Sequence, residues 1–262
     1  MKEGEASMTA RRVAQHRLGF DRLPAAYGRP ADDDKLQADV AAGIEVAPSS
    51  MGRYLQARTR FFDRQVVEAI DAGIRQIVVA GAGYDGRSLR YSNPTTRWFE
   101  LDHPSTQADK LERLERLAIA SPGTAFGAVD FANGEVDQVL ASLGHDAELA
   151  TMFFCEGVAP YLPEAVLAWL LSALRLGAAV RSRLAIEFAL VPTSPEQIER
   201  RARLAAKVAD LGEPLRSTLS RETIEPFLIG LGWTVTSARA PDGTDLAVSE
   251  TSVAFVTAEP AS

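Results

Sequence analysis

A glycine-rich turn that follows an apolar segment is the feature that most narrows the folds open to this chain. The apolar segment Gln76–Ala80 runs into Gly81, Gly83 and Gly86. Residues without a Cβ atom let the backbone come close to a ligand. The next apolar segment ends in Asp102, whose carboxylate can accept hydrogen bonds from a ribose. This order of strand, glycine turn and acid-ended strand predicts a nucleotide-like cofactor, and the glycine spacing by itself also fits a dinucleotide.

Apolar segments alternate with helical patterns through the middle of the chain. Strands are expected at residues 74–80, 97–101, 124–129, 149–154 and 184–190, with helices between them at residues 105–119, 134–143 and 163–176. Such alternation is typical of a doubly wound α/β sheet with parallel strands. Two further strands, at residues 232–237 and 252–257, flank a polar loop and predict an antiparallel pair. Five parallel strands closed by such a pair are more typical of methyltransferases than of dehydrogenases.

The two ends of the chain differ from this alternating middle. Residues 1–60 have a helical apolar spacing that prolines interrupt, and they are expected to form a helical cap. Residues 61–262 are expected to form one core, because no Ser/Gly/Pro-rich linker divides the chain. A helix over residues 195–211 follows the fifth strand and predicts a helical lid inserted at about residues 193–215. A shorter helix is expected at residues 223–231.

Charge and composition argue against several classes of function. The net charge of -7 argues against a nucleic-acid partner, because phosphate binding needs clustered Lys and Arg. The single cysteine, Cys155, excludes an internal disulfide and fits a reducing cytoplasm. With three histidines and one cysteine, no metal site built by the protein is expected. Because no segment resembles a membrane helix or a secretory signal, we expect a cytoplasmic protein without a membrane partner.

The residues inside the glycine turn distinguish between two cofactors. In a dinucleotide fold, apolar residues usually follow the glycines and pack the next helix on the strand. Here residues 84–88 are polar and include Asp85. A carboxylate at this place would repel a pyrophosphate, but the cationic amino-sulfonium end of S-adenosylmethionine would tolerate or use it. The turn therefore favours the methyl donor. An NAD-dependent oxidoreductase stays the alternative, although no convincing catalytic Tyr-Lys, His or Cys set accompanies the turn.

Acids stand at three successive strand ends. Asp102 ends the second expected strand, Asp130 follows the third, and Glu156 follows the fourth. In open α/β sheets, ligands bind at the carboxyl edge, where these acids gather. We assign Asp102, rather than Glu100, to the ribose because it stands at the strand end. Asp130 and its neighbour Phe131 suit the amino group and ring of an adenine, and Glu156 suits the reacting end of the cofactor.

Four short motifs resemble those of a known family. They are QARTR at residues 56–60, GAGYDGRSLR at 81–90, WFELDHP at 98–104 and EGVAPYLP at 156–163. Over residues 54–190 the chain resembles the leucine carboxyl methyltransferase family, including its bacterial and natural-product branch. The resemblance implies a class I S-adenosylmethionine-dependent methyltransferase with a doubly wound, seven-stranded, Rossmann-like sheet in the order 3-2-1-4-5-7-6.

The resemblance also implies roles for individual residues in binding the donor. In the family, these roles are a contact to the donor's carboxylate, close backbone approach, and recognition of the ribose, the adenine and the amino group. Arg58 matches the residue that contacts the donor's carboxylate, and Gly81 and Gly83 match the backbone that approaches it. Asp102 matches the acid that recognises the ribose. Asp130 and Phe131 match the pair that recognises the adenine, and Glu156 matches the acid near the amino group. The polar turn adds Asp85 to this predicted cofactor site. One stretch departs from the family: GVAP at residues 157–160 replaces bulkier residues, so the family name alone does not predict the substrate.

The chemistry of methyl transfer limits what the acceptor needs. Transfer from a sulfonium is an in-line displacement that depends on alignment in a dry site. A carboxylate acceptor is ionised near neutral pH and needs no general base, whereas a phenol must lose its proton. The sequence does not identify a catalytic residue or decide whether a general base is used. His103 is the tempting base, but it lies between Asp102 and Pro104 and is expected to point away from the methyl group. Tyr161 is a candidate acceptor contact.

The predicted activity is therefore O-methylation of a carboxylate or an acidic phenol on a small natural-product-type molecule. Carboxyl methylation of a protein C-terminus is the second hypothesis. A non-catalytic protein that binds S-adenosylmethionine is a third, of another class. The sequence does not indicate the oligomeric state.

Overall fold

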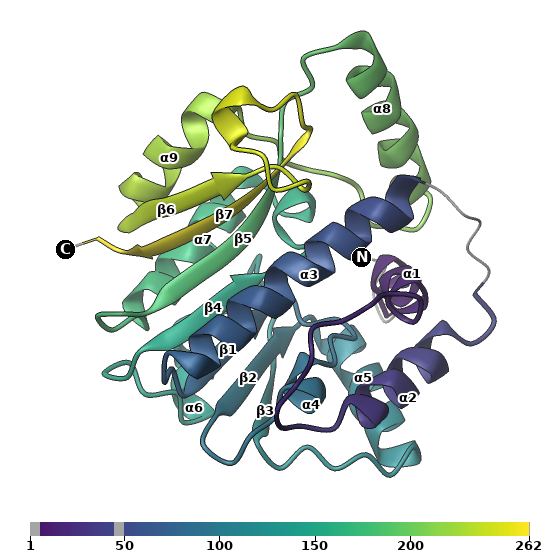
Figure 1. The fold of residues 1–262 in the computed structure, drawn as a ribbon, viewed down its shortest axis with the longest axis vertical. Helices are drawn as coiled ribbons and strands as arrows, with labels where there is room; N and C mark the ends of the chain where they lie inside the picture. The colour runs from purple at the N-terminus through teal and green to yellow at the C-terminus, as the bar shows by residue number, and fades with distance from the viewer. Residues whose placement is uncertain (1–5, 45–49, 262) are drawn as a thin grey trace.

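One mixed sheet of seven strands organises the part of the chain that the computed structural model describes, residues 6–44 and 50–261 (Figure 1). Its order, β3-β2-β1-β4-β5-β7-β6, confirms the order implied by the family resemblance. The parallel strands are β1 (Gln76–Ala80), β2 (Arg97–Asp102), β3 (Thr124–Ala128), β4 (Thr151–Cys155) and β5 (Arg183–Ala189). The sheet is closed by β6 (Trp233–Arg239) and β7 (Val253–Pro260), and β7 runs antiparallel to both β5 and β6.

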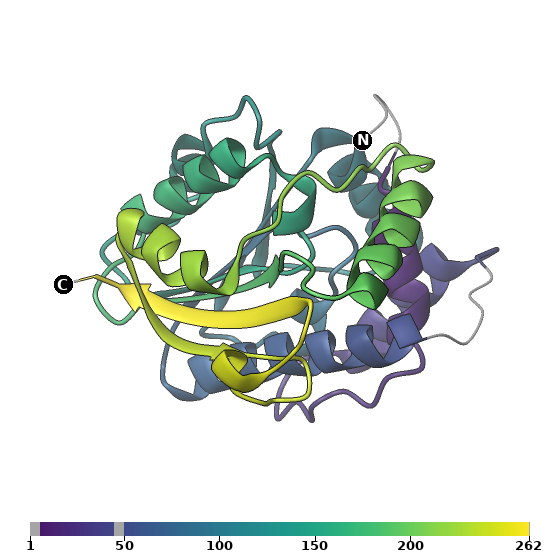
Figure 2. The ribbon, with the colours of Figure 1, turned by 90° about the horizontal axis from the view of Figure 1, so that it is seen from above.

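Helices cover both faces of the sheet (Figure 2). One face packs against α3 (Ser50–Asp71) through Phe62, Val66 and Ala69. The other face packs against α6 (Val136–Ser142), α7 (Glu164–Leu176) and α9 (Arg221–Gly230). Because both faces are covered, β1 and β4 are buried at every position, which explains why both read as unbroken apolar segments.

A third group of helices packs around the glycine turn at the carboxyl edge of the sheet. They are α1 (Met8–Arg17), α2 (Pro30–Ala41), α4 (Arg87–Arg90) and α5 (Pro104–Arg116). Their shared core contains Ala14, Leu36, Leu89 and Leu114, with Tyr84 of the turn among them. The first two helices belong to the expected cap, of which residues 1–5 and 45–49 lie outside the described residues.

Two features concern the expected division of the chain. Helix α3 runs without a break across residue 60, where we expected the cap to end. Helix α8 (Pro195–Ala209) follows β5 and precedes α9, as expected for the inserted lid, and it lies near α1 in Figures 1 and 2. Within the described ranges, no helix is long and apolar enough to cross a membrane.

The sequence did not predict α4, which begins directly after the glycine turn. Two short 3-10 helices were also missed: η1 (Ala159–Tyr161), which follows β4, and η2 (Leu246–Val248), in the loop between β6 and β7. All three are short and lack an apolar period from which they could be recognised.

Candidate functional site

The glycine turn joins β1 to α4 through two residues in the left-handed region. Gly81 has φ of 76° and Gly83 has φ of 50°. A Cβ atom added at Gly81 would lie 2.0 Å from Cγ2 of Val158, in the loop after β4. A side chain at Gly81 is therefore excluded by the backbone angle and by the neighbouring loop together. The turn forms the close backbone surface that the sequence predicted.

Asp102 folds back over this turn from the end of β2. Its Oδ2 accepts a hydrogen bond from the N–H of Gly83 at 2.5 Å, and its Oδ1 accepts one from the N–H of His103 at 2.7 Å. Burial raises the pKa of Asp102 to about 6, although both amide hydrogen bonds favour the charged form. The structure thus brings together the turn and the acid that we assigned to the ribose.

Glu100, the other acid of β2, has different partners. Lys110 of α5 donates to its Oε2, and the Ser88 hydroxyl donates to its Oε1 at 2.6 Å. Lys110 also donates to the main-chain oxygen of Asp85 at 2.6 Å. Because Glu100 is neutralised by a buried lysine below the turn, it supports the turn and leaves the strand end to Asp102.

Glu156, just beyond β4, accepts hydrogen bonds from three arginines. Arg17 Nη2 lies 2.9 Å and Arg58 Nε 3.1 Å from its Oε1, and Arg87 Nη1 lies 2.6 Å from its Oε2. Burial alone would raise the pKa of Glu156, but the charges of Arg87, Arg17 and Arg58 together bring it below its usual range. Glu156 is therefore ionised near neutral pH.

Asp85 lies on the same group of cations. Its Oδ1 accepts from the main-chain N–H of Arg87 at 2.8 Å, and its Oδ2 accepts from the guanidinium groups of Arg87 and Arg17. Arg17 and Arg87 therefore join the acid of the glycine turn to the acid beyond β4. We predicted Asp85 and Glu156 from different signals, and the structure brings them into one ionic cluster.

Arg58 lies in α3 with its guanidinium buried between two acids. Besides Glu156, it contacts Oε1 of Glu187 in β5 through Nη1 at 3.0 Å. The Tyr54 hydroxyl donates to the other oxygen of Glu187 at 2.8 Å. Burial raises the pKa of Glu187, and the nearby Arg58 opposes that rise. Arg58 is thus at the predicted site, but two of its nitrogens bind acids of the protein itself.

Arg87 is the most enclosed member of the cluster, with no exposed side-chain surface. Its Nε donates to Asp63 of α3 at 2.7 Å, and its Nη2 donates to the main-chain oxygen of Thr59 at 3.1 Å. Asp63 also pairs with Arg22, which precedes α2. Arg87 therefore ties the turn to α3.

Arg17, at the last position of α1, belongs to this ionic cluster and was not predicted from the sequence. A single nitrogen, Nη2, contacts both Asp85 at 3.3 Å and Glu156 at 2.9 Å. Its Nε is buried and has no hydrogen-bond partner among the described residues. A buried guanidinium N–H without an acceptor is costly unless a ligand supplies one. Nothing in the local sequence of α1 separates Arg17 from its basic neighbours.

Asp130 and Phe131 lie in the turn after β3, beside the end of β2. The link is direct, because the N–H of Val129 donates to the main-chain oxygen of Asp102 at 2.8 Å. Asp130 accepts hydrogen bonds from the Ala132 N–H at 3.0 Å and from the Asn133 side chain at 3.2 Å. Phe131 packs, half-buried, against the main core. The pair therefore borders Asp102 on the side away from Glu156.

The two residues considered for the acceptor differ in their surroundings. His103 is the N-cap of α5, and its Nδ1 accepts a hydrogen bond from the Ser105 N–H at 3.3 Å. Tyr161 ends η1, and burial raises the pKa of its hydroxyl, while Thr9 of α1 opposes that rise. Tyr161 thus lies close to α1, whereas His103 is held by its own helix.

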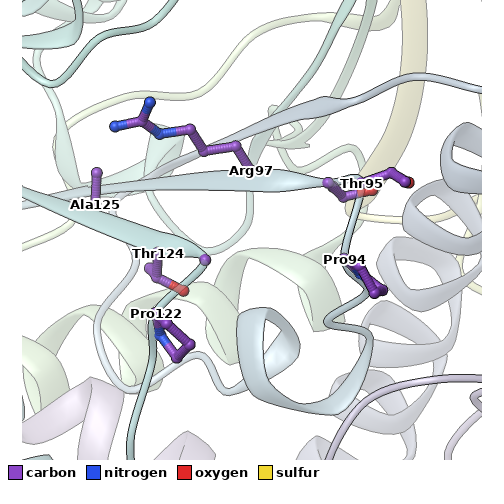
Figure 3. Close-up of a pocket in the computed structure, with 8 residues that line it drawn as sticks. Pro94, Thr95, Arg97, Pro122, Thr124 and Ala125 are labelled. Carbon is purple, nitrogen blue, oxygen red and sulfur yellow. The ribbon is translucent and has the colours of Figure 1, made fainter.

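Two surface hollows lie at the opposite edge of the sheet. One, of about 350 Å³, is lined by residues at the amino-terminal ends of β2 and β3, including Thr95, Arg97 and Thr124 (Figure 3). The other, of about 480 Å³, lies near Arg175 and Arg183 at the start of β5. Neither contains a residue of the predicted site. In the described ranges, no group of His, Cys, Asp and Glu is arranged to hold a metal ion.

Comparison with known proteins identifies the family of the chain and agrees with the fold. The sequence profile of the leucine carboxyl methyltransferase family matches residues 12–175. A Mycobacteroides abscessus protein that carries the name of an S-adenosyl-L-methionine-dependent methyltransferase is 32% identical over 234 residues, which cover 86% of this chain and 77% of that protein. A Mycobacterium ulcerans protein of the same name is 34% identical over 169 residues, or 64% of this chain, and the match spans about half (52%) of that relative's length.

Solved structures show the same fold at low sequence identity. A DUF574 family protein from Streptomyces avermitilis superposes with a TM-score of 0.62 at 15% identity, covering 97% of this chain and 98% of the other. A magnesium protoporphyrin IX methyltransferase from Synechocystis, solved with bound S-adenosylhomocysteine, has a TM-score of 0.55 at 14% identity and covers 84% of this chain and 90% of its own. From the matched profile, which spans more than half of the sequence, the chain belongs to the leucine carboxyl methyltransferase family.

Proposed function

We propose that this protein is an S-adenosylmethionine-dependent methyltransferase. The observation that carries the proposal is the arrangement of Asp102, Asp85 and Glu156 around the glycine turn at the carboxyl edge of β2, β1 and β4. This edge is where doubly wound sheets bind nucleotide ligands. The membership in the family and the names of the relatives support the same activity.

The residues present fit the donor in chemistry. The carboxylate of Asp102 suits ribose hydroxyls, and Asp130 with Phe131 suits the adenine. Glu156, which is ionised, and the side-chain oxygens of Asp85 suit the donor's ammonium group. The unpartnered Nε of Arg17 suits its carboxylate, which adds a residue to the one arginine, Arg58, that the sequence predicted.

The chain's own residues would hold and orient the donor rather than react with it. S-adenosylmethionine supplies an electrophilic methyl group on a sulfonium. Asp85 and Glu156 would offer carboxylate oxygens to that cationic end, and the cap helices α1 and α2 would exclude water from the turn. Burial raises the pKa of the Cys155 thiol to about 12, so this residue stays protonated and does not compete for the methyl group.

A dinucleotide fits the same turn less well. The turn offers the pyrophosphate of NAD no helix N-terminus of useful length, since α4 has four residues, and Arg17 and Arg87 are already paired with Asp85 and Glu156. Calorimetry with S-adenosylhomocysteine and with NAD separates the two functions. We expect binding of S-adenosylhomocysteine and none of NAD, and the reverse would overturn the proposal.

For the acceptor, we propose a carboxylate or an acidic phenol on a small molecule. His103 is held as a helix cap, and the hydroxyl of Tyr161 has a raised pKa, so neither is set up as a strong base near neutral pH. An acceptor that is already ionised needs no base. The family's name, for a carboxyl methylation, points in the same direction.

The test is a screen with methyl-labelled donor against small carboxylic acids, phenols, amines and a peptide ending in leucine. Methyl esters are labile to mild alkali, whereas aryl ethers and methylamines are not, so the label's stability identifies the acceptor atom. Transfer to amines alone would contradict the proposed O-methylation. Transfer to the peptide alone would favour the protein C-terminus as substrate. Binding of donor without transfer to any acceptor class would favour a non-catalytic binding protein.

A further inference from the structure

Helix α1 is a basic helix without an acid of its own. Its ten residues include Arg11, Arg12, His16 and Arg17 and no Asp or Glu. The N-terminus of a helix has unpaired N–H groups and a partial positive charge, which an acidic side chain normally offsets. The N-cap Ser7 satisfies only one of these groups, the N–H of Ala10, at 3.0 Å. The helix therefore needs an acceptor from elsewhere in the chain.

Glu213 supplies that acceptor from a position about 200 residues further along. Its Oε1 accepts from the N–H groups of Met8 at 2.8 Å and Thr9 at 3.3 Å. Its Oε2 accepts from the hydroxyl of Ser7 at 3.0 Å and from that of Thr9. Glu213 is only 8% exposed. A buried carboxylate with four donors from one helix start is a built tertiary cap, and its charge suits the helix N-terminus.

The segment that carries Glu213 is itself fixed to the loop after β4. It follows α8, and the Glu213 N–H donates to the Val208 oxygen at 3.0 Å. Just beyond it, the Arg216 N–H donates to the oxygen of Pro160 at 2.7 Å, and the Ser217 hydroxyl donates to that of Ala159 at 2.8 Å. These acceptors belong to η1, which ends at Tyr161. The end of the segment expected to form the lid is thus joined to α1, and the residues just beyond it are joined to η1, next to the candidate acceptor contact Tyr161.

The other end of α1 lies on the donor site. Arg17 contacts Asp85 and Glu156. Ala10, nearer the start of the helix, lies over the glycine turn, because a Cβ atom added at Gly83 would be 3.1 Å from the Cβ atom of Ala10. Ten helical residues span about 15 Å and behave as one rigid element. Fixing the first turn of α1 through Glu213 therefore limits where Arg17 can reach.

We propose that Glu213 is a positioning residue for the donor site: by capping α1, it holds Arg17 against Asp85 and Glu156 and couples the segment after α8 to donor binding. The coupling to the donor rests on the proposed function, whereas the cap itself does not. Loss of Glu213 should therefore act through Arg17, and it should weaken only the binding of the amino-acid end of the ligand.

The experiment compares Glu213→Ala with Glu199→Ala as the matched control, because Glu199 is an exposed glutamate of α8 that forms an ion pair with Arg203 on the same helix. Calorimetry measures the Kd of two ligands: S-adenosylhomocysteine, and 5′-methylthioadenosine, which lacks the amino-acid end. We expect Glu213→Ala to raise the Kd of S-adenosylhomocysteine by about three- to thirty-fold, the range that corresponds to loss of a helix N-cap. The Kd of 5′-methylthioadenosine should change less than twofold, and Glu199→Ala should change neither.

A double variant tests the route through Arg17. In an Arg17→Met background, adding Glu213→Ala should raise the Kd of S-adenosylhomocysteine less than twofold. An equal effect in both backgrounds, or an equal loss of both ligands, would overturn the proposal and leave Glu213 as a general contributor to stability. If Glu213→Ala does not fold, Glu213→Gln serves instead, because it keeps one acceptor oxygen without the charge and should give a smaller change of the same pattern.

Hydrogen exchange of the protein without ligand separates failure of this inference from failure of the proposed function. We expect the amides of residues 8–17 to exchange at least tenfold faster in Glu213→Ala, and unchanged exchange would overturn the cap. If the wild-type chain binds no S-adenosylhomocysteine, the proposed function fails, while faster exchange in the variant would still establish the cap.

Discussion

The carboxylate of Asp102 and the main-chain N–H of Gly83 are joined by a hydrogen bond of 2.5 Å, which links the end of β2 to the glycine turn after β1. The acid that we propose to accept hydrogen bonds from the ribose is thereby held beside the glycine turn, where a ligand can come close to the backbone. The same carboxylate has a pKa raised to about 6 by burial. Binding of the donor should therefore depend on Asp102 in two measurable ways.

Asp102→Ala should weaken binding of S-adenosylhomocysteine by about 1–3 kcal/mol, because charge-assisted hydrogen bonds to the ribose are lost. Calorimetry on the folded variant measures this change. Asp137→Ala, at an exposed position of α6, is the control and should bind as the wild type does. Unchanged affinity in Asp102→Ala would mean that another acid holds the ribose.

The affinity of the wild type should fall as the pH drops through about 6, because the raised pKa means that Asp102 gains a proton there and loses acceptor capacity. Asp102→Asn should lack this step. The same raised pKa makes the folded state bind the proton more tightly than the unfolded state, so this residue's contribution to stability decreases as the pH rises from about 4 to about 6. Urea unfolding of the wild type and of Asp102→Asn across this range gives the free energy of unfolding against pH. Parallel curves for the two proteins would contradict a raised pKa of Asp102.

Glu156→Gln should destabilise the fold by about 3–5 kcal/mol, because Arg17, Arg58 and Arg87 would lose a buried counter-charge. The pKa of Glu156 is lowered, so its stabilising effect is present above its usual range and is lost as the pH falls below about 4. Urea unfolding near neutral pH and in acid measures both effects. Glu199→Gln, at the exposed surface, should change neither. A difference below about 1 kcal/mol would show that the arginines find other partners.

Gly81→Ala should destabilise the fold by about 2–5 kcal/mol, from a strained positive φ together with the overlap with Val158. Two comparisons separate these causes. Gly73→Ala has a similar φ of 81° but nothing within 4 Å, so it measures the backbone cost alone. Gly81→Ala combined with Val158→Ala removes the overlapping methyl group and should recover part of the loss. No recovery in the double variant would place the whole cost in the backbone.

Lys110→Met should destabilise the fold more than the pair Lys110→Met with Glu100→Gln. The single variant leaves the carboxylate of Glu100 buried without its cation, whereas the double variant removes the charge as well. A double-mutant cycle on unfolding free energies measures this coupling, which we expect at about 1–3 kcal/mol. An additive cycle would mean that the two residues act independently.

The strands could be predicted because their signals are local. β1 and β4 are buried on both faces and therefore read as unbroken apolar segments, and the glycines mark a turn with positive φ. α4 was missed for the opposite reason. Its residues Arg87, Ser88 and Arg90 are polar, and their burial depends on partners in α3, β2 and α2 that neighbouring residues do not reveal.

The sequence by itself determined the strands, the turn and the acids at the strand ends, because each rests on the period of apolar residues and on backbone angles that only glycine adopts readily. The order of the strands in the sheet followed only from the resemblance to the family. Only the tertiary structure decided which cations meet those acids. Arg17 reaches Glu156 across 139 positions of sequence, and Thr9 reaches Glu213 across 204. Such pairs depend on how α1 docks on the finished sheet, and a pairing in space leaves no fixed spacing in the chain.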